Sequence, residues 1–542
     1  MKVNGLKFIL ISLYTFVFSL ISWFTNVKSL SGIDDANIYF IYMRNLANGN
    51  GFCYNIGGEK VEGFTSLLWT LIGSFCFKLT ENPEIFLLIL NFILVNYTLW
   101  KIVCFIDNLI ASRKLISSQS LLFLGLLAVF PGFFEWTILS LMESALFFSI
   151  LSLTSLQILE YILFDKKINY SFSILLGLLL LTRPESILWV PFFIFCNFFI
   201  SLNKGNSIKS AITSLIFPFF LSSLVLASIT IWRLNYFGYP FPNTYYAKVS
   251  DDLLFNLKNG SIYILECMSN YPVLLLSPIL LIFLLFKKKK QFLPIVFLLL
   301  FCLTSIAIPT INGGDHFQYA RFLQVGMPIF ILAIIFFLYF TNYKLNFLKV
   351  FLIVALGVIS SRFLILKNIY HQTSPLANEW EIAIEGRKNA KNLNTFFQDI
   401  KRLPVQGVYT AGGSAFFYKG ETIDLLGLNN SKIAHSKKNK FAPKNHAAFN
   451  KKIFYEMHPD IFWLAGNTFK PKEVKTEIFM HINPFAEKVF QKIEKNSKFK
   501  KEYACGVLSK KNHPVVILAF FSKKFLSSLD SNRFQFKQVD IK

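Results

Sequence analysis

Residues 33–40 read IDDANIYF and follow directly on the first hydrophobic span of the chain, Leu6 to Phe24. Two adjacent carboxylates just outside a membrane helix are costly to keep near lipid, so Asp34 and Asp35 indicate a polar site at the membrane surface. A carboxylate in that position can take a proton from a hydroxyl group while the hydroxyl oxygen attacks an activated donor. The pair is therefore the first candidate for a catalytic base.

The same pair also has a purely structural interpretation. Asp35 is suited to N-cap a short helix over residues 36–47, which Asn48 and Gly49 would end. On the pair alone both interpretations stay open, and it is the surrounding sequence that favours catalysis.

The composition is that of a polytopic membrane protein. Hydrophobic residues make up 54% of the 542 residues, aromatic residues make up 17%, and 63 residues are Phe. No small-residue cleavage site follows the first span, so we expect a retained first helix and not a removed signal peptide. The seven Cys are scattered and form no CxxC pair, which excludes a zinc ribbon and a disulfide framework.

Lysine and arginine residues predict the orientation of the chain in the membrane. Basic clusters occur at 166–167, 204–209, 287–290 and 344–349. They alternate with polar loops, so the positive-inside rule places the basic clusters in the cytoplasm and the polar loops on the outer side. We therefore expect a multi-pass protein of the inner (cytoplasmic) membrane whose active site is extracytoplasmic, in the periplasm.

Hydrophobic spans predict a polytopic α-helical membrane protein with roughly 11 transmembrane helices. After the first span they cover about 118–133, 143–164, 171–182, 186–201, 210–232, 271–286, 292–310, 322–341 and 346–366. Residues 64–106 contain two apolar runs broken at Asn82-Pro83, although the alternation of charge requires an odd number of crossings there. One of these runs is therefore a candidate for a re-entrant segment, or for a helix that lies against the bundle.

The composition changes after Leu366. Residues 367–542 contain 30 Lys and Arg against 15 Asp and Glu, and they have no spanning segment. Apolar patterns predict strands at 405–409, 415–418, 461–465 and 515–521, and helices at 378–397 and 484–493. We therefore expect two domains: a transmembrane domain over 1–366, with a first extracytoplasmic loop at 25–63, and a soluble extracytoplasmic α/β domain over 367–542.

The basic charge of this tail has two interpretations. It suits docking on anionic lipid headgroups or acidic glycans, and it equally suits a Lys-biased but merely solvated surface. Nucleic acid is excluded as a partner, because the charge is predicted outside the membrane and no nucleic-acid motif accompanies it.

Six polar motifs follow one another along the chain. They are the stretch 33–66, WTILSLMESAL at 136–146, LTRPESIL at 181–188, RLNYFGYPFPNTYYAK at 233–248, NGGDHF at 312–317 with Arg321-Phe322, and IDLLGLN at 423–429. In order and spacing they resemble the GT-C glycosyltransferases of the mycobacterial terminal arabinofuranosyltransferase and Legionella LphB type. The resemblance runs over nearly the whole chain. At one position the first loop departs from it, because Ile41 stands where the family has an Arg, and Arg44 lies nearly one helical turn further on.

The resemblance implies a GT-C enzyme that takes a sugar from a polyprenyl-phosphate donor on the outer face of the membrane. A pentose such as arabinofuranose is one candidate sugar, and an envelope glycan or glycolipid is the implied acceptor. The donor has a tail that needs the lipid bilayer, an anionic phosphate at the interface and a sugar in the aqueous layer. Its site should therefore combine an apolar groove, cationic or amide donors and a carboxylate base.

Under this resemblance Asp34 and Asp35 are the catalytic pair, one as the base and the other orienting the acceptor or tuning its neighbour. The cationic candidates for the donor phosphate are Arg183, Lys248 and Arg321. Further substrate-binding candidates are Arg44, Glu62, Glu143, Glu185, Asn243, Tyr245, Tyr246, Asp315 and His316. His316 has no second ligand at metal spacing, so no protein-bound metal is expected, whereas a divalent cation carried by the substrate stays open.

Some of these candidates have structural interpretations as well. Arg183 and Glu185 flank a proline and could form a tight turn at the interface. Glu143 begins a helix, where a carboxylate complements the helix dipole. The adjacent Tyr245 and Tyr246 are also typical of the aromatic belt of a membrane protein.

Two other function classes fit a polytopic protein with charged motifs. One is a lipid-linked sugar flippase or transporter, and the other is a non-catalytic envelope-assembly protein. A transporter needs charges near the middle of the membrane, whereas the charged motifs of this chain are all predicted on one face. The enzyme is therefore the favoured interpretation.

Overall fold

The chain folds into two compact units that interleave along the sequence. The computed structural model describes residues 2–541 except 28, 113, 358–375, 438–442, 444 and 471–478. Unit 1 comprises Met1–Gly32, Thr65–Asn235 and Asp252–Asn378, and unit 2 comprises Ile33–Phe64, Tyr236–Asp251 and Glu379–Lys542. Unit 2 thus contains the C-terminal region together with most of the first polar loop and a short segment after residue 235.

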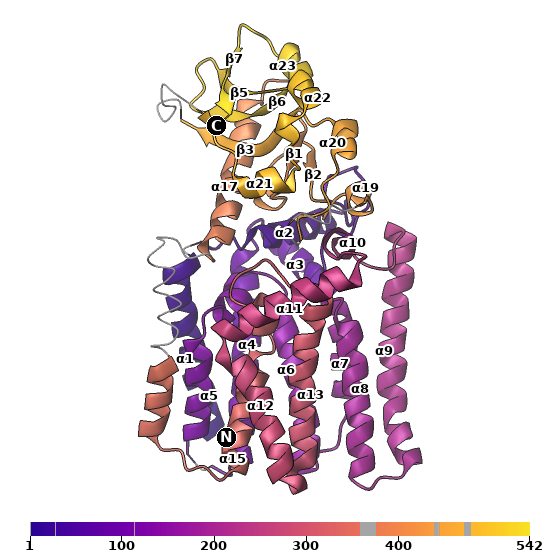
Figure 1. The fold of residues 1–542 in the computed structure, drawn as a ribbon, viewed down its shortest axis with the longest axis vertical. Coiled ribbons are helices and arrows are strands. Elements are labelled where there is room, and N and C mark those ends of the chain that lie inside the picture. Colours follow the sequence, from indigo (N-terminus) through magenta and orange to yellow (C-terminus); the bar gives the residue numbers. More distant parts are fainter. Residues whose placement is uncertain are drawn as a thin grey trace. The chain divides into compact units, whose positions relative to one another are not determined.

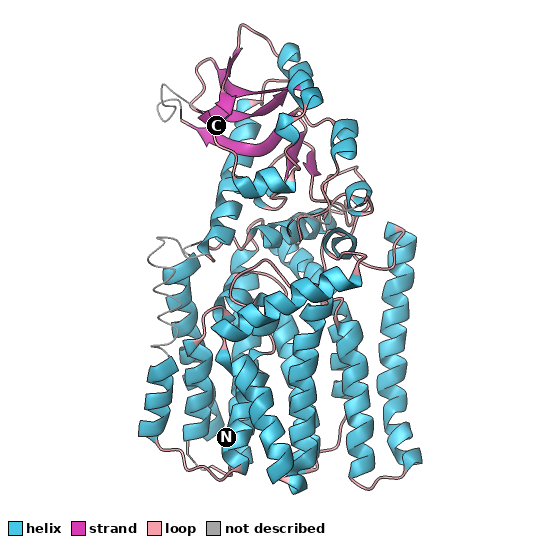
Figure 2. Ribbon diagram, viewed as in Figure 1, coloured by secondary structure: helices cyan, strands magenta, loops and turns pink. Residues whose placement is uncertain are grey.

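Unit 1 is helical (Figures 1 and 2). The helices long and apolar enough to cross a membrane, among the described residues, are α1 (Lys2–Ser22, extended by a π-helical turn at Trp23–Val27), α4 (Glu84–Leu109), α6 (Ser144–Phe164), α8 (Ser186–Asn203), α9 (Ile208–Phe237) and α13 (Phe292–Ile311). The consecutive helices α11 (Leu253–Asn270) and α12 (Pro272–Lys287) are bent by 92° and give a seventh span if they count as one. Shorter apolar helices are α3 (Leu67–Leu79), α5 (Ser118–Val129), α7 (Tyr170–Thr182), α15 (Met327–Phe340) and Phe347–Gly357. The predicted polytopic helical fold is confirmed, although six or seven of the described helices have the length and composition of a membrane span, against the roughly 11 predicted.

The helices differ from the predicted spans where proline and glycine interrupt the pattern. The span predicted at 118–133 ends at Val129, shortly before Pro131, which cannot donate a helical hydrogen bond. The span predicted at 322–341 is divided into α14 (Arg321–Gln324) and α15, with Gly326 between them. Residues 253–270, which fall outside the predicted spans, form α11, whose N-cap Asp252 accepts a hydrogen bond from the amide of Phe255.

A buried ion pair fastens the first helices of unit 1 to one another. Lys7 of α1 pairs with Asp107 of α4, and both side chains are almost inaccessible to solvent. Asp107 also accepts a hydrogen bond of 2.7 Å from the hydroxyl of Ser120 in α5. Because both charges have partners, the pair can lie among apolar helices, and it holds α1, α4 and α5 in register.

Unit 2 is built around a six-stranded mixed sheet, drawn in magenta in Figure 2. The strand order is β2-β1-β3-β6-β5-β7, in which β1 is parallel to β2 and β3 and the remaining neighbours are antiparallel. The strands are β1 (Gln406–Val408), β2 (Thr422–Asp424), β3 (Ile461–Phe469), β5 (Tyr503–Lys510), β6 (Val516–Ser522) and β7 (Phe534–Gln538), while β4 (Phe479–Met480) and β8 (Asp540–Ile541) form a separate pair. Its other helices are α2 (Asp34–Ala47), α10 (Asn243–Lys248), α17 (Ala377–Phe396), α18 (Gly413–Phe416), α19 (Ser431–Ala434), α20 (Lys451–Met457), α21 (Pro484–Val489), α22 (Ser497–Glu502) and α23 (Lys523–Ser528).

Both faces of the sheet carry a hydrophobic core, and the central strand β6 shows why. Every residue of β6 is buried. Val516, Leu518 and Phe520 belong to one core, whereas Ile517 and Phe521 belong to the other. Successive side chains of a strand point to opposite faces, so a continuous apolar run is what a strand covered on both sides requires.

The predicted α/β character of the C-terminal region is confirmed, with one element wrong. Strands β1, β3 and β6 lie at three of the predicted strand positions, and α17 lies at the predicted helix 378–397. Residues 415–418, predicted as a strand, instead fall at the end of α18 and the bend that follows it. The Gly412–Gly413 pair turns the backbone there, and a carboxylate from α2 accepts hydrogen bonds from both amides, which are then unavailable to a sheet.

Candidate active site

Asp34 and Asp35 form the first turn of α2, and neither of them caps the helix. The N-cap is Ile33, which makes no side-chain capping bond, so the purely structural interpretation of Asp35 is not what the structure shows. The helix ends as predicted at Asn48 and Gly49, and the glycine has a φ of +80°. The carboxylates at the start of α2 are therefore available for other contacts.

Asp34 binds the backbone of α18 within unit 2. Its Oδ2 accepts from the amide of Gly412 at 3.0 Å, and its Oδ1 accepts from the amide of Gly413 at 2.8 Å. A Cβ atom at Gly412 would lie 1.8 Å from the carbonyl oxygen of Asp34, so only glycine allows this approach. Asp34 therefore joins the first loop to the C-terminal region, 378 residues further along the chain.

Burial raises the pKa of Asp34 from 3.8 to about 6. The hydrogen bonds from Gly413 and Gly412 act in the opposite direction, and the nearby charges of Asp35 and Asp424 add to the rise. Desolvation is the largest of these effects. The site thus contains a carboxyl group that changes its protonation near neutral pH, which is the range in which an acid or base is most useful.

Asp35 differs from its neighbour in both exposure and partner. Its side chain is 21% exposed, and the Nζ atom of Lys248 lies 3.6 Å from its Oδ2. Lys248 is the last residue of α10, so the fourth motif places a positive charge beside Asp35 of the first motif. The sequence assigned Lys248 to the donor phosphate, whereas the structure places it beside Asp35.

The sixth motif is joined to the first through Tyr42. The hydroxyl of Tyr42 donates to Oδ1 of Asn429 at 3.0 Å, and Asn429 in turn donates from its backbone and side chain to the buried Asp424. A Cβ atom at Gly63 would lie 1.9 Å from the same Asn429 oxygen. Burial raises the pKa of Asp424 as well. Residues about 380 positions apart are thus held by a network of buried hydrogen bonds.

Asn243 connects the fourth motif to the sixth motif, which contains Asn429. Its side-chain amide donates to the carbonyl oxygens of Gly427 at 2.7 Å and Leu428 at 2.9 Å. Its backbone amide donates to the carbonyl oxygen of Glu62, whose side chain is buried. Asn243 and Glu62, both candidates for substrate binding, therefore lie where the three motifs of unit 2 meet.

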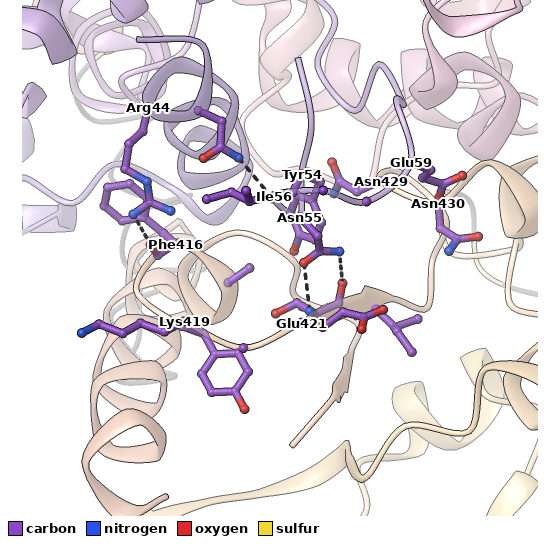
Figure 3. Close-up of a pocket in the computed structure, with 18 of the residues that line it drawn as sticks. Arg44, Tyr54, Asn55, Ile56, Glu59, Phe416, Lys419, Glu421, Asn429 and Asn430 are labelled. Atoms are coloured by element: carbon purple, nitrogen blue, oxygen red, sulfur yellow. Dashed lines mark hydrogen bonds between the residues drawn. The ribbon is translucent and has the colours of Figure 1, made fainter. Parts of the chain in front are cut away.

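The remaining candidates of unit 2, Arg44, Tyr245 and Tyr246, have other partners than Asp34 and Asp35. Arg44 donates to the carbonyl oxygen of Phe416 at 2.7 Å and covers the ring of the same residue at 4.9 Å (Figure 3). Tyr245 is 42% exposed, and Tyr246 packs at 4.3 Å from the ring of His435. Arg44 thus faces the C-terminal region, and the two tyrosines belong to an aromatic cluster.

Arg183, in unit 1, is held by two carboxylates. Its Nη1 lies 2.6 Å from Oε1 of Glu143, and its Nε lies 2.5 Å from Oε1 of Glu185. Glu143 is fully buried, and its second oxygen has no hydrogen-bond partner among the described residues. The second and third motifs therefore meet in one buried ion-pair cluster.

Arg321 forms a second cluster close to the first. Its Nε donates to Oδ2 of Asp315 at 2.8 Å, and Nδ1 of His316 lies 3.5 Å from the other Asp315 oxygen. The guanidinium carbons of Arg321 and Arg183 lie 5.3 and 5.4 Å from the centre of the Phe322 ring. The two arginines are therefore neighbours, and each is already partnered by a carboxylate.

Several residues of this region were not predicted from the sequence. Gly412 and Gly413 are the partners of Asp34, and His435 stacks on Tyr239 with ring centres 3.9 Å apart. The Gly-Gly sequence before an apolar run was the one local signal for Gly412 and Gly413. Nothing in the local sequence distinguishes His435. Within the described ranges no three His, Cys, Asp or Glu side chains gather as a metal site.

Comparison with known proteins identifies the fold. No known family model and no curated protein sequence matches this chain. Among solved structures, the archaeal oligosaccharyltransferase AglB from Archaeoglobus fulgidus, in complex with an inhibitory peptide and a dolichol-phosphate, matches with a TM-score of 0.54 and 11% identity, over 98% of this chain and 75% of that one. The apo form of the Archaeoglobus fulgidus oligosaccharyltransferase matches with a TM-score of 0.53 and 11% identity, over 97% and 77%. The chain therefore has a fold similar to that of these archaeal oligosaccharyltransferase structures.

Proposed function

We propose that this protein is a membrane glycosyltransferase that transfers a sugar from a polyprenyl-phosphate donor to an envelope glycan or glycolipid. The observation that carries the proposal is the paired carboxylate at the start of α2, where Asp35 is partly exposed and Asp34 is anchored. The similar fold of AglB, a protein whose structure contains a dolichol-phosphate, supports a lipid-linked donor. We place the reaction on the outer face of the cytoplasmic membrane, because the basic loops are predicted in the cytoplasm.

Asp35 acts as the general base in this proposal. A base must come within hydrogen-bond reach of the acceptor hydroxyl, and of the two carboxylates Asp35 is the more exposed. Lys248 lies 3.6 Å from Asp35 and limits the positions that the carboxylate can take. Asp34 is a positioning residue, since both of its oxygens accept backbone hydrogen bonds that fix the turn carrying Asp35.

The arginines of unit 1 are proposed to bind the donor phosphate. A guanidinium has five N–H donors, so one that gives a single bond to a carboxylate can be oriented by it for a further acceptor. Arg321 lies beside Asp315, and Arg183 lies beside Glu143 and Glu185. Both are candidates, because their guanidinium groups lie close to the same Phe322 ring.

The test is to delete the gene and analyse both the envelope glycans and the polyprenyl-phosphate sugars of the cells. Loss of a transferase removes one terminal sugar from the glycan and lets its lipid-linked donor accumulate. Arabinofuranose is the first sugar to assay, because the motif resemblance points to it. Re-expression of the unchanged chain should restore the glycan, and re-expression of Asp35→Asn should not.

Two outcomes would count against the proposal. Unchanged glycans in the deletion strain would show that no such transfer depends on this protein. Restoration by Asp35→Asn as complete as by the unchanged chain would leave a transport or assembly role, since neither needs the basicity of this carboxylate.

A further inference from the structure

Unit 2 contains a large cavity whose wall includes neither Asp34 nor Asp35. Its volume is about 930 Å³, and its wall is formed by the end of α2, the first loop and the segment between α18 and β2 (Figure 3). Ligand sites commonly measure roughly 300–1,000 Å³, so this one has room for more than a single sugar ring. None of the residues to which the proposed reaction assigns catalysis lines it.

The wall combines aromatic rings with amide groups, as a surface that binds sugars needs to. Phe417 is partly exposed and supplies a ring on which the apolar face of a sugar can pack, whereas Tyr54 and Phe416 line the wall but are almost fully buried. Asn55 is fixed by two hydrogen bonds to the backbone of Thr422, whereas the exposed side chain of Asn48 makes none to any described residue. The cavity thus has a rigid frame and at least one amide directed to solvent.

The charges on the wall do not balance, and the excess is positive. Glu59 accepts two hydrogen bonds from Ser431, and Glu421 lies 3.7 Å from Arg402, so both acids of the wall are engaged. Among the described residues, neither Arg44 nor Lys419 has a carboxylate partner. Figure 3 draws these two cations on the same side of the cavity, opposite Glu59.

A bound anion would give Arg44 the counter-ion that it does not have among the described residues. Its one hydrogen bond goes to a neutral carbonyl oxygen, and burial lowers the pKa of the guanidinium because a charge without a counter-ion is poorly solvated there. A carboxylate or phosphate group of a ligand would form charge-assisted hydrogen bonds with Arg44 and Lys419 together.

We propose that this cavity binds a segment of the acceptor glycan that carries an acidic group, with Arg44 and Lys419 facing the acid. The inference rests on the proposed function for the identity of the ligand as an acceptor. The chemistry is that of an anionic saccharide, and its charge can come from a uronic acid or from a phosphorylated sugar. The cavity would thereby select the glycan to which the sugar is added.

The test is calorimetric titration of the full chain in detergent with three saccharides of equal length. They are tetragalacturonic acid, its carboxyl-reduced neutral form, and a phosphorylated maltotetraose. At least one of the two acidic probes should bind about tenfold or more tightly than the neutral one, because a charge-assisted hydrogen bond contributes more than a neutral one. The stronger of the two identifies the source of the charge.

Lys419→Gln should weaken binding of the acidic probe about tenfold while leaving the neutral probe unaffected. Lys537→Gln is the matched control, since it removes the same charge from an exposed position on β7 outside the cavity. Equal binding of acidic and neutral probes, no binding of any saccharide, or tighter binding of an acidic hexapeptide would each overturn the proposal.

Repeating the titration with Asp35→Asn separates this inference from the proposed function. Binding does not require transfer, so the variant should bind the acidic saccharide as the unchanged chain does. If the deletion strain lacks a sugar but no probe binds, the cavity inference fails and the transferase stands. If the probe binds through Lys419 but the glycans of the deletion strain are intact, the transferase fails and an acidic-saccharide site remains.

Discussion

The acidic side chains of the two units are stabilised in different ways. In unit 1, Glu143, Glu185 and Asp315 each lie 2.5–2.8 Å from an arginine nitrogen. In unit 2, Asp34 accepts from two backbone amides, and the Nζ atom of Lys248 lies 3.6 Å from Asp35. The first group consists of close ion pairs, whereas Asp34 is held by neutral backbone amides.

This difference indicates a division of labour. Burial raises the pKa of Asp34 to about 6, although the two backbone hydrogen bonds act in the opposite direction. Arg183 and Arg321 of unit 1 are engaged in close ion pairs with carboxylates. Proton transfer is therefore expected from unit 2, and structural support from unit 1.

The largest expected effect is that of Asp35→Asn on transfer. The amide keeps the size of the side chain but cannot accept the proton, so the rate should fall roughly 10²–10⁴-fold. The measurement is transfer of radiolabelled sugar from a polyprenyl-phosphate donor by purified protein. Asp251→Asn is the control, since Asp251 is an exposed aspartate of the same unit. If both variants keep full activity, Asp35 is not the base.

The second prediction concerns the ion pairs of unit 1. Arg183→Gln leaves the fully buried Glu143 without its cation, and removing one partner of a buried pair costs about 3–5 kcal/mol in the free energy of unfolding. Adding Glu143→Gln removes the unbalanced charge, so the double variant should be more stable than Arg183→Gln alone. Thermal unfolding in detergent measures both.

Lys166→Gln is the comparison for these two variants of the buried ion pair. Lys166 pairs with Glu160 at a more exposed position, where such a pair contributes about 0–1 kcal/mol. If the double variant of Arg183 and Glu143 is no more stable than Arg183→Gln, the cluster does not act as a charge-balanced unit.

The features predicted correctly from the sequence depend on neighbouring residues, whereas those that were missed depend on contacts between distant segments of the chain. The helix over 36–47 and its end at Gly49 follow from neighbouring residues, so both were predicted correctly. The strand predicted at 415–418 was wrong because the preceding amides of Gly412 and Gly413 are bound by Asp34, from a part of the chain 378 residues away, and the chain turns there into α18. No local pattern contains that information.

The candidate site shows the same limit. Order and spacing of motifs indicated Asp35, Lys248 and Asn243 as functional residues, but not which of them would meet. Lys248 lies beside Asp35, and Asn243, five residues before Lys248, is bound to the backbone at Gly427. Pairings of this kind depend on how distant segments pack, and a single sequence does not specify them.

The third prediction is a pH dependence of stability that Asp34 causes. Its pKa is about 6 in the folded chain against an ordinary 3.8, so between these values the folded form binds more protons than the unfolded form. Stability should therefore fall as pH rises from 4 to 6 and then level off, by about 3 kcal/mol in all.

The measurement compares thermal unfolding of the unchanged chain with that of Asp34→Asn at pH 4 and pH 7. The variant has no group to titrate at this position, so its stability should vary less between the two pH values. An identical change in both proteins would show that Asp34 is not the source of the dependence.

The smallest expected effect is that of Lys248→Gln, which tests how strongly the lysine supports Asp35. At 3.6 Å, with both side chains more than a fifth exposed, the pair should contribute less than about 1 kcal/mol. An interaction of this size corresponds to a loss of only a few-fold in the rate of transfer. Lys248→Arg keeps the charge and should restore the original rate. A loss as large as that of Asp35→Asn, at every pH and in both lysine variants, would instead assign Lys248 a direct role on the donor.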